Sequence, residues 1–346
     1  MKIHMVKLTD IAERAHVSVG TVSHVLTGKG DQRRISKATQ EKVLRIAAEL
    51  NYQPNVFAKR LRDRHSVPVF MLFYKPGLSS SLLGEVIRGI QKVQIETSHS
   101  FEVMVQPYVS EEFEWAKKTL SSTSVNGVIM CNTTIEESQE LEKMDFRVPV
   151  VFFNRYSSKY SSVYSDFSAV GFQVASLFQK AGYRNVALVG TGQNISTHMK
   201  REQGFLSACQ RLGMKARPWI AEQSQNSALY GYLMTQQIID SGEMPDGIFY
   251  SADEFAVGGI RACTERHIPL PETMGIISYG ASYFNDYATP SISSISFPVT
   301  KMVQDCVNLL LDKYYNNGTE CKSIRFEAAF SFKESFQPPD DIVKIS

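Results

Sequence analysis

The chain has 346 residues, more than the roughly 100–200 residues of one compact domain, so we expect two or three folded units. Its hydrophobic share of 43% and charged share of 21% are typical of a globular protein and exclude a disordered or fibrous chain. The net charge of +2 is spread unevenly. Residues 1–65 contain 13 Lys or Arg and 6 Asp or Glu, a net of +7, and the remainder carries −5. This asymmetry predicts a polyanionic partner for the N-terminal part, although a solvated basic face has the same composition.

Cysteine usage and apolar runs exclude further classes. The five cysteines are widely spaced, without a CxxC pair or a histidine at metal-ligand spacing, so we expect no disulfide framework, no metal and no cofactor. No apolar run reaches the roughly 18 residues of a membrane span, and the first residues, MKIHMVKLTD, lack the apolar core of a signal peptide. A cytoplasmic location is expected. An enzyme is disfavoured, because no catalytic triad, metal set or carboxylate pair is recognisable.

Residues 8–26, LTDIAERAHVSVGTVSHVL, predict two short helices joined by a tight turn. Thr9 is expected to cap the first helix, and Ser18 the second. This pattern is typical of a helix-turn-helix, whose second helix enters the DNA major groove with its N-terminal part leading. The positions expected to face outward on that helix are Val19, Gly20, Ser23 and His24.

The expected outward residues suit different DNA contacts. Val19 can pack on a thymine methyl group, and His24 can exchange a hydrogen bond with a base edge. Gly20 allows close approach, whereas the hydroxyl groups of Thr21 and Ser23 suit phosphates. The basic, glycine-containing loop at 28–34 is also expected to touch phosphates.

Ser36 is expected to cap a third helix, within SKATQEKVLRIAAEL, whose apolar residues complete a small core. After Pro54 the chain continues NVFAKRLRDRHS. Its composition fits a plain basic linker. Its mixture of small, apolar and cationic residues also suits a short helix laid in a minor groove, where one apolar side chain opens a base step.

The ordered run from residue 8 to Leu61 resembles the DNA-binding head of the lactose-repressor/galactose-repressor family. The resemblance implies a helix-turn-helix domain at 6–53 and a hinge helix with linker at 54–65. It implies that Leu61 intercalates, that Ala58 faces the minor groove, and that His16 replaces a turn glycine. The residues expected to contact DNA are Thr9, Ser18, Val19, Gly20, Thr21, Ser23, His24, Asn55, Ala58, Leu61 and Arg62.

From residue 67 the pattern becomes an alternation of apolar runs and amphipathic helices, which predicts parallel sheets with helical crossovers. Strands are predicted at 68–74, 101–107, 125–131, 148–153, 185–190, 216–221, 246–251 and 273–279. Helices are predicted at 82–97, 166–181, 253–266 and 299–316. The body, 66–337, is expected to form two lobes. The first is expected at about 66–160 and 299–322, and the second at about 161–298 and 323–337.

Stretches such as FFNR, KAGYRNVALVG and SADEFAVGG show that the body also resembles the same family. The corresponding part of that family looks like a periplasmic sugar-binding protein. Ligands of open α/β lobes bind at the carboxyl ends of the strands. By resemblance, Arg201 and Asn154 are expected to face the ligand. For Arg201 the structural alternative is a surface arginine at the start of a helix. For Asp253 the alternative to ligand binding is a helix cap. The residues expected to bind the effector are Ser81, Phe153, Asn154, Thr197, Arg201, Asn226, Asp253 and Tyr279.

Three departures from the family pattern bear on the effector. Gly280 stands where an acid usually follows Tyr279, Ala252 where asparagine is common, and Asn226 where an aromatic residue is common. Fewer polar anchors weaken sugar specificity. A sugar or sugar phosphate is the expected effector, and a protein partner is the alternative.

The combined expectation is a small all-α head joined to an α/β, two-lobed, periplasmic-binding-protein-like body with two parallel Rossmann-like sheets. The expected function is a transcription regulator, a repressor of carbohydrate-related genes, acting as a homodimer on near-palindromic double-stranded operator DNA. A sugar-binding protein without a DNA role is a weaker alternative, because the basic head opposes it.

Overall fold

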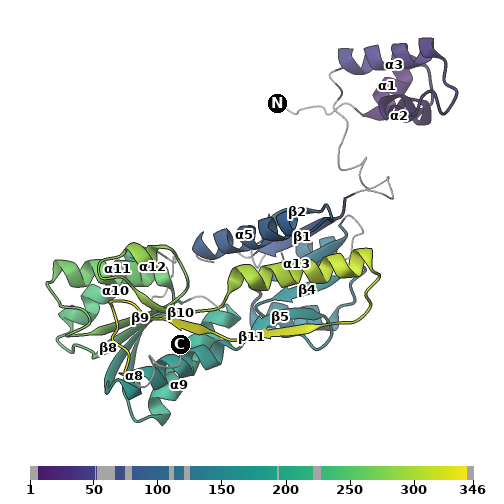
Figure 1. The fold of residues 1–346 in the computed structure, drawn as a ribbon. Helices are drawn as coiled ribbons and strands as arrows, with labels where there is room; N and C mark the ends of the chain where they lie inside the picture. Colours follow the sequence, from purple (N-terminus) through teal and green to yellow (C-terminus); the bar gives the residue numbers. More distant parts are fainter. Residues whose placement is uncertain are drawn as a thin grey trace. The chain divides into compact units, whose positions relative to one another are not determined.

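The computed structural model describes residues 7–50, 52, 67–74, 80–108, 113–120, 125–192, 195–220 and 227–340, without the side chains of residues 80–81, 115–116 and 119–120. The chain divides into two compact units, Met1–Val67 and Pro68–Ser346, which we call the head and the body (Figure 1). The division agrees with the predicted change of pattern near residue 67.

The described head consists of α1 (Leu8–Ala15), α2 (Val19–Leu26) and α3 (Lys37–Glu49), which enclose a small core. The side chains of Ser18 and Ser36 cap α2 and α3, as the sequence predicted for both. His16 ends α1 in the left-handed conformation, at φ 54°, in which histidine is better tolerated than most residues. The prediction that Thr9 caps α1 is wrong. The helix begins at Leu8, so the cap position is Lys7, two residues earlier than predicted, and the Asp10 carboxylate accepts the Lys7 backbone N–H at 2.8 Å.

The first lobe of the body contains a parallel sheet whose six described strands have the order β11-β5-β4-β3-β1-β2. These strands are β1 (Val69–Tyr74), β2 (Glu102–Pro107), β3 (Gly127–Cys131), β4 (Val150–Phe153), β5 (Ser161–Ser165) and β11 (Ser323–Phe326). Side chains alternate between its two faces. One face packs on α5 (Ser80–Glu96) and α13 (Val299–Tyr315), which lie side by side in Figure 1. The other packs on α6 (Phe113–Leu120) and α7 (Ile135–Lys143).

The second lobe contains a sheet whose six described strands have the order β12-β10-β9-β8-β6-β7, all parallel except β12. These strands are β6 (Asn185–Gly190), β7 (Lys215–Ile220), β8 (Gly247–Tyr250), β9 (Gly275–Tyr279), β10 (Ser293–Ser296) and β12 (Ala329–Ser331). Helices α8 (Phe167–Lys180) and α9 (Ser196–Arg211) cover one face. Helices α10 (Ala228–Asp240) and α11 (Asp253–Glu265) cover the other, and α12 (Phe284–Tyr287) follows β9 (Figure 1).

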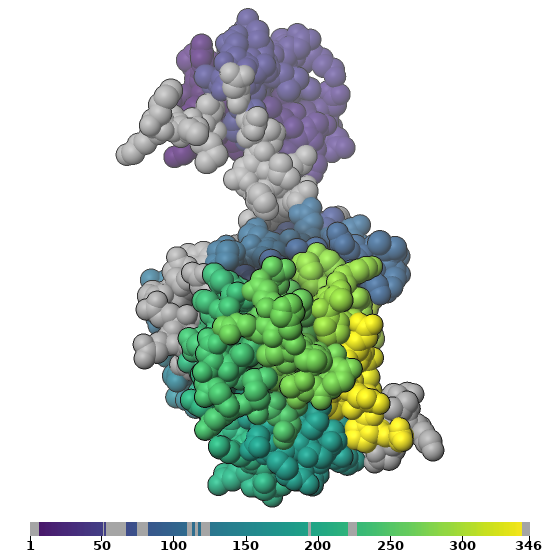
Figure 2. Space-filling view, turned by 90° about the vertical axis from the view of Figure 1, so that its left-hand side faces the viewer, coloured from purple at the N-terminus to yellow at the C-terminus, as the bar shows by residue number. Residues whose placement is uncertain are grey.

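The lobe boundaries differ from the prediction in two places. β5 pairs with β4 and β11 pairs with β5, so residues 161–165 and 323–326 belong to the first lobe rather than the second. β12 pairs with β10, and Figure 2 shows the C-terminal segment, in yellow, against the second lobe. The chain therefore crosses between the lobes just before α8, just before α13 and just after β11. Helix α13 packs on the first lobe, as predicted.

The two lobes share one hydrophobic core, which runs from the α5 and α13 face of the first sheet to the α8 and α9 face of the second. Among the described residues, every helix is too short or too polar to span a membrane.

Candidate functional site

Helix α2 presents the residues predicted to read DNA on its exposed N-terminal half. Val19 is 42% exposed and Gly20 is exposed, whereas Thr21 and His24 are half-buried. Ser18 Oγ accepts the Thr21 backbone N–H at 3.1 Å and lies 2.9 Å from Thr21 Oγ1. The two hydroxyl groups therefore hold the start of the helix in place. Thr9, on α1, is also exposed.

Ser23 does not take the outward position that the sequence predicted. Only 9% of Ser23 is exposed, because it lies beside Val22 and Val25 on the face of α2 that packs into the head core. Its carbonyl oxygen accepts the Thr27 hydroxyl at 2.8 Å. The outward positions are better described as Val19 and Gly20, with His24 at the edge of the buried face.

The basic loop at 28–34 is folded onto α3. Asp31 accepts hydrogen bonds from Lys37 Nζ and Gln40 Nε2, both at 2.9 Å, and Gln40 also donates to the Ile35 carbonyl at 2.8 Å. These contacts leave Arg33 and Arg34 exposed. Phosphate contact by this loop stays a prediction, and its exposed cations are compatible with it.

Among the cavities of the described part of the body, two contain residues predicted to bind the effector, one of about 600 Å³ and one of about 240 Å³, and both lie at the carboxyl ends of strands. The first two turns of α9 contribute to both. His198 and Arg201 line the larger cavity, and Thr197 and Lys200 line the smaller one. A cluster of aromatic rings lies between them. Phe167, from the wall of the smaller cavity, packs on Tyr279 and Phe297 of the larger one at ring distances of 5.9 and 5.1 Å.

The position of α9 depends on glycine at its contact with α8. A Cβ atom at Gly171 would lie 2.2 Å from the Arg201 carbonyl oxygen, and one at Gly204 would lie 2.4 Å from the Ser168 carbonyl oxygen. Only residues without a side chain permit this approach. The close packing holds the backbone of Arg201 at the inner wall of the larger cavity.

Arg201 is the largest buried side chain of this wall and is 1% exposed. Its Nη2 donates to the Ser251 carbonyl at 2.5 Å, and its guanidinium carbon lies 3.8 Å from the centre of the Tyr279 ring. Burial lowers the pKa of Arg201, and the nearby Tyr279, Glu202 and Asp253 act in the opposite direction. The alternative of a surface arginine at a helix start is wrong, since Arg201 lies within α9 and faces inward.

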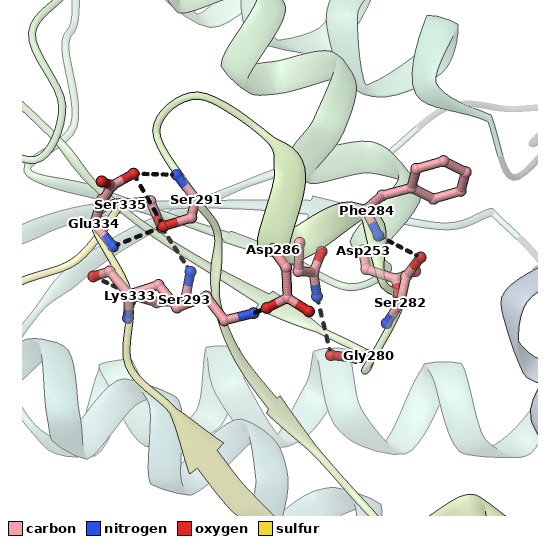
Figure 3. Close-up of polar contacts among 11 residues, drawn as sticks. Asp253, Gly280, Ser282, Phe284, Asp286, Ser291, Ser293, Lys333, Glu334 and Ser335 are labelled. Carbon is pink, nitrogen blue, oxygen red and sulfur yellow. Dashed lines mark hydrogen bonds and ion pairs between the residues drawn. The ribbon is translucent and has the colours of Figure 1, made fainter.

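Asp253 lies opposite, at the start of α11, and is 2% exposed. Its Oδ1 accepts the Glu254 backbone N–H at 3.0 Å. Its Oδ2 accepts the Ser282 backbone N–H at 2.9 Å, and Figure 3 shows Asp253 beside Ser282. The carboxylate thus joins the start of α11 to the β9–α12 loop. The prediction that Asp253 caps the helix is wrong, because Ala252 occupies the cap position and Asp253 is the first residue of α11. Burial raises the pKa of Asp253 to about 6, and the hydrogen bond from Ser282 opposes this shift.

Gly280 explains why an acid is missing after Tyr279. Its φ of +136° strains other residues, and a Cβ atom there would lie 2.5 Å from Asp253 Oδ2. The Asp253 carboxylate therefore occupies the space into which a side chain at position 280 would project. The Asn285 side chain donates from Nδ2 to the Gly280 carbonyl at 3.3 Å.

His198 and Glu202 complete the buried polar group next to Arg201. Burial and the positive charge of Arg201 lower the pKa of His198 to about 3, so the imidazole is neutral at pH 7. Its Nδ1 lies 3.2 Å from Thr191 Oγ1. Glu202 accepts the Thr191 backbone N–H at 2.8 Å, and burial raises the pKa of its carboxyl group.

The smaller cavity joins the ends of β3, β4 and β5 to the starts of α8 and α9. Asn132 and Asn154 follow β3 and β4 in the left-handed conformation, at φ 56° and 61°, and are 5% and 8% exposed. Within the described residues, Asn132 Nδ2 and Asn154 Oδ1 have no hydrogen-bond partner. These two amides give the cavity one free donor and one free acceptor.

The expected effector residues are therefore divided between two cavities. Phe153, Asn154 and Thr197 line the smaller cavity. Arg201, Asp253 and Tyr279 line the larger one. Several predicted residues lie outside the described residues or side chains: Ser81, Asn226, Asn55, Ala58, Leu61 and Arg62.

Sequence reasoning missed several cavity residues. His198 was not predicted, although it lies three residues before Arg201 and hence on the same side of a helix. Glu85 and Arg88 of α5 also line the larger cavity, and no local pattern distinguishes them from surface charges. No cluster of metal-binding side chains is found within the described residues.

Two family models match this chain. Residues 7–55 match bacterial regulatory proteins of the lacI family, and residues 175–336 match a periplasmic binding protein-like domain. The ribose operon repressor of Haemophilus influenzae is 24% identical over 334 residues, covering 96% of this chain and 98% of the repressor. Catabolite control protein A of Priestia megaterium is 26% identical over 325 residues, covering 92% and 95% respectively.

A solved structure shares the fold of both units. The lac repressor dimer bound to operator and the anti-inducer ONPF matches with a TM-score of 0.68 at 20% identity, covering 95% of this chain and 98% of that chain. At this identity the likeness establishes the fold.

Proposed function

This chain belongs to the lacI family of bacterial regulatory proteins, and we propose that it is a sequence-specific repressor whose affinity for operator DNA is set by a small molecule bound in the body. The observation that carries the proposal is the exposed N-terminal half of α2, presented by a small, capped, three-helix head with a net positive charge. Relatives named as repressors, such as the ribose operon repressor, support the direction of control and a role in carbohydrate metabolism.

For the head, we propose that α2 enters the major groove with Val19 and Gly20 leading. Val19 packs on a thymine methyl group, Gly20 allows close approach, and His24 reads a base edge. The hydroxyl groups of the exposed Thr9 and Ser18 and of the half-buried Thr21 contact phosphates, which position the helix without reading sequence. Ser23 contributes at most through its backbone, because its side chain is buried.

For residues 54–65, we propose a hinge helix that binds the central minor groove. Leu61 wedges into a base step, Asn55 and Ala58 face the groove, and Arg62 contacts a phosphate or the groove. The mutation Leu61→Ala should lower operator affinity at least 10-fold in duplex-binding titrations while the thermal unfolding of the body stays unchanged. Near-wild-type affinity would rule out the wedge.

For the body, we propose that a sugar or sugar phosphate binds at the carboxyl ends of the strands and changes the angle between the two lobes. Two such bodies form a homodimer, which places two heads on the half-sites of a near-palindromic operator. A ligand shifts DNA affinity only to the extent that it binds the two lobe arrangements differently. The regulator itself carries out no chemical reaction in this scheme.

The proposal is tested by selecting duplexes with randomised, twofold-symmetric half-sites on the full-length protein. A defined near-palindromic sequence should emerge, and its affinity should fall steeply with salt because each phosphate contact releases counterions. A panel of sugars and sugar phosphates is then added to the selected complex. Absence of a salt-sensitive preference for any symmetric duplex would contradict the proposed function.

A further inference from the structure

The chain enters the body at Pro68 and Val69, and neighbouring strands hold the backbone of both residues. The Pro68 carbonyl oxygen accepts the Glu102 backbone N–H at 2.9 Å, at the start of β2. Asn126, directly before β3, bonds to both polar groups of the Val69 backbone. Its Oδ1 accepts the Val69 N–H at 2.9 Å, and its own backbone N–H donates to the Val69 carbonyl oxygen at 2.8 Å. We call this pair of bonds the entry clamp.

The second lobe contains the same pair of bonds where β6 begins. Asp246, directly before β8, accepts the Asn185 backbone N–H at 2.8 Å and donates its own N–H to the Asn185 carbonyl oxygen at 2.7 Å. Its carboxylate also accepts the Arg184 N–H at 2.6 Å. The Arg184 carbonyl oxygen accepts the Lys215 N–H at 2.8 Å. The two lobes thus begin their sheets in the same way, and the second lobe supplies an internal comparison for the entry clamp.

The acceptor side chains differ because the residues before the two strands differ. Arg184 has a backbone N–H, so the Asp246 carboxylate receives two N–H groups. Pro68 has none, so the single amide oxygen of Asn126 satisfies the only N–H at this position. The proline ring also restricts φ of Pro68 to about −65°, and Pro68 is buried. A rigid residue and a residue with both backbone groups bonded therefore fix the entry point of the chain.

The two strand starts also differ in what precedes them. The ring of Tyr183, directly before Arg184, packs on Phe178 of α8 at 5.3 Å, so the core of the second lobe holds that strand start a second time. Before Pro68 the chain leaves the body, because the boundary between head and body lies between Val67 and Pro68. Pro68 and Val69 are therefore the residues of the body that the chain from the head reaches first.

We propose that Asn126 is a positioning residue for operator binding, which fixes the place and direction in which the chain leaves the body toward the head. This inference rests on the proposed function, because it concerns DNA binding by the head. Without the Asn126 oxygen, the Val69 N–H loses its partner and β1 begins later. The freed residue must be ordered again when two heads bind one operator, and ordering the backbone of one residue costs about 10-fold in affinity.

The test compares Asn126→Ala with Asp246→Ala, the matched change in the second lobe. Operator duplexes are titrated with the full-length protein, and urea unfolding reports the stability of the body. Asp246→Ala should destabilise the body more, because it leaves two N–H groups without an acceptor. Asn126→Ala should nevertheless bind operator more weakly, by about 10-fold, whereas Asp246→Ala should stay within about 2-fold of the wild type.

Two further measurements separate positioning from other roles. Asn126→Asp keeps an oxygen that accepts the Val69 N–H, so its affinity should lie within about 2-fold of the wild type. The slope of affinity against salt should be the same in Asn126→Ala and the wild type, because no phosphate contact is removed. If Asn126→Ala gives no cooperative unfolding transition, Pro68→Gly replaces it. That change frees φ before the clamp and should lower affinity about 3-fold, whereas the matched Arg184→Gly should not.

The proposal is overturned if Asn126→Ala binds operator like the wild type, if Asp246→Ala loses as much affinity, or if Asn126→Asp fails to restore it. A reduced salt slope in Asn126→Ala would place Asn126 on the DNA and would overturn the proposal as well. The wild-type protein is measured first, on randomised duplexes. Absence of operator preference there contradicts the proposed function, whereas unchanged binding by the variants of a selective wild-type protein contradicts only the positioning role.

Discussion

The head and the body place their candidate functional residues in opposite environments. On α2 of the head, Val19 is 42% exposed, and Gly20 beside it is exposed as well. In the body, Arg201 is 1% exposed and Asp253 is 2% exposed. In the proposed function, the head presents its side chains to a large partner that remains outside, whereas the body encloses a small one.

This difference changes which forces dominate at each site. At the exposed face of α2, water and salt screen charge, so specificity depends on shape and hydrogen bonds in the groove. Inside the body, burial shifts the protonation of the site residues. It lowers the pKa of His198 to about 3 and raises that of Asp253 to about 6. A change of charge is therefore expected to matter more in the body, and loss of a small core more in the head.

The largest expected effect comes from unfolding the head alone. Val22 is fully buried in the small core of the head. The mutation Val22→Asp therefore places an unpaired charge inside that core. Operator affinity should fall at least 100-fold, while the thermal transition of the body remains. The control is Leu44→Asp, at a residue of α3 that is 51% exposed, which should leave the head folded by circular dichroism. Retained operator binding by Val22→Asp would show that the head does not act as an independent unit.

The next effect concerns the space that Asp253 occupies in the body. Gly280→Ala combines an unfavourable φ with a Cβ atom 2.5 Å from Asp253 Oδ2. It should lower the free energy of unfolding of the body by about 3 kcal/mol in urea titrations. Gly213→Ala is the matched control, because its φ is also positive, at +70°, but nothing lies within 4 Å of the added Cβ. That control should lose about 1 kcal/mol. Equal losses would show that the contact with Asp253 costs nothing.

The same comparison explains which structural elements the sequence could predict. The head follows from local patterns. Capping by Ser18 and the left-handed His16 depend on neighbouring residues, so both could be predicted. Ser23 was misplaced because a small polar side chain can lie at the edge of a core without changing the pattern.

The strands of the body also divide into those that local sequence patterns predict and those that they do not. β1 and β8 are apolar runs, typical of strands buried on both faces, and were predicted. β5 (SSVYS), β10 (SSIS) and β11 (SIRF) are short and rich in serine or mixed in character. They are strands because they pair with distant parts of the chain, and at β5 and β11 this misled the prediction of the lobe boundaries.

The cavity residues were the hardest to predict because they come from loops far apart in the sequence. Arg201 and Asp253 were found through family resemblance, and Gly280 through its departure from the family pattern. The division between two cavities results from rings at positions 167, 279 and 297, which meet only in the folded chain.

A smaller effect is expected in the pH dependence of the free energy of unfolding, which reports on the buried ionisable groups of the body. The unfolded chain binds a proton at His198 below about pH 6.5, whereas the folded chain does so only near pH 3, so this group lowers stability as the pH falls between those values. Asp253 acts in the opposite direction between about pH 6 and pH 4, because the folded chain holds its proton more tightly. In the wild type, the two contributions to the pH dependence of the free energy of unfolding partly cancel.

Replacing His198 should reveal the pH dependence that Asp253 contributes to the free energy of unfolding. Relative to the wild type, His198→Gln should change the free energy of unfolding between pH 7 and pH 5 by about 2 kcal/mol in favour of pH 5. The measurement is urea unfolding at both pH values. His99→Gln, at an exposed histidine, is the control and should not change the difference. An unchanged pH dependence in His198→Gln would show that this imidazole is not held neutral by burial.

The smallest effect lies at a single base pair. His24 is half-buried at the edge of the exposed face of α2, so it can reach only one base edge while Val19 and Gly20 lead into the groove. His24→Ala should therefore relax preference at one operator position, by about 1 kcal/mol, and leave the other positions unchanged. The salt dependence of binding should also stay the same, because no phosphate contact is removed. Selection from randomised half-sites measures both quantities. A uniform loss of affinity across all sequences would instead place His24 on the DNA backbone, and the exposed face of α2 would then read the operator through Val19 and Gly20 alone.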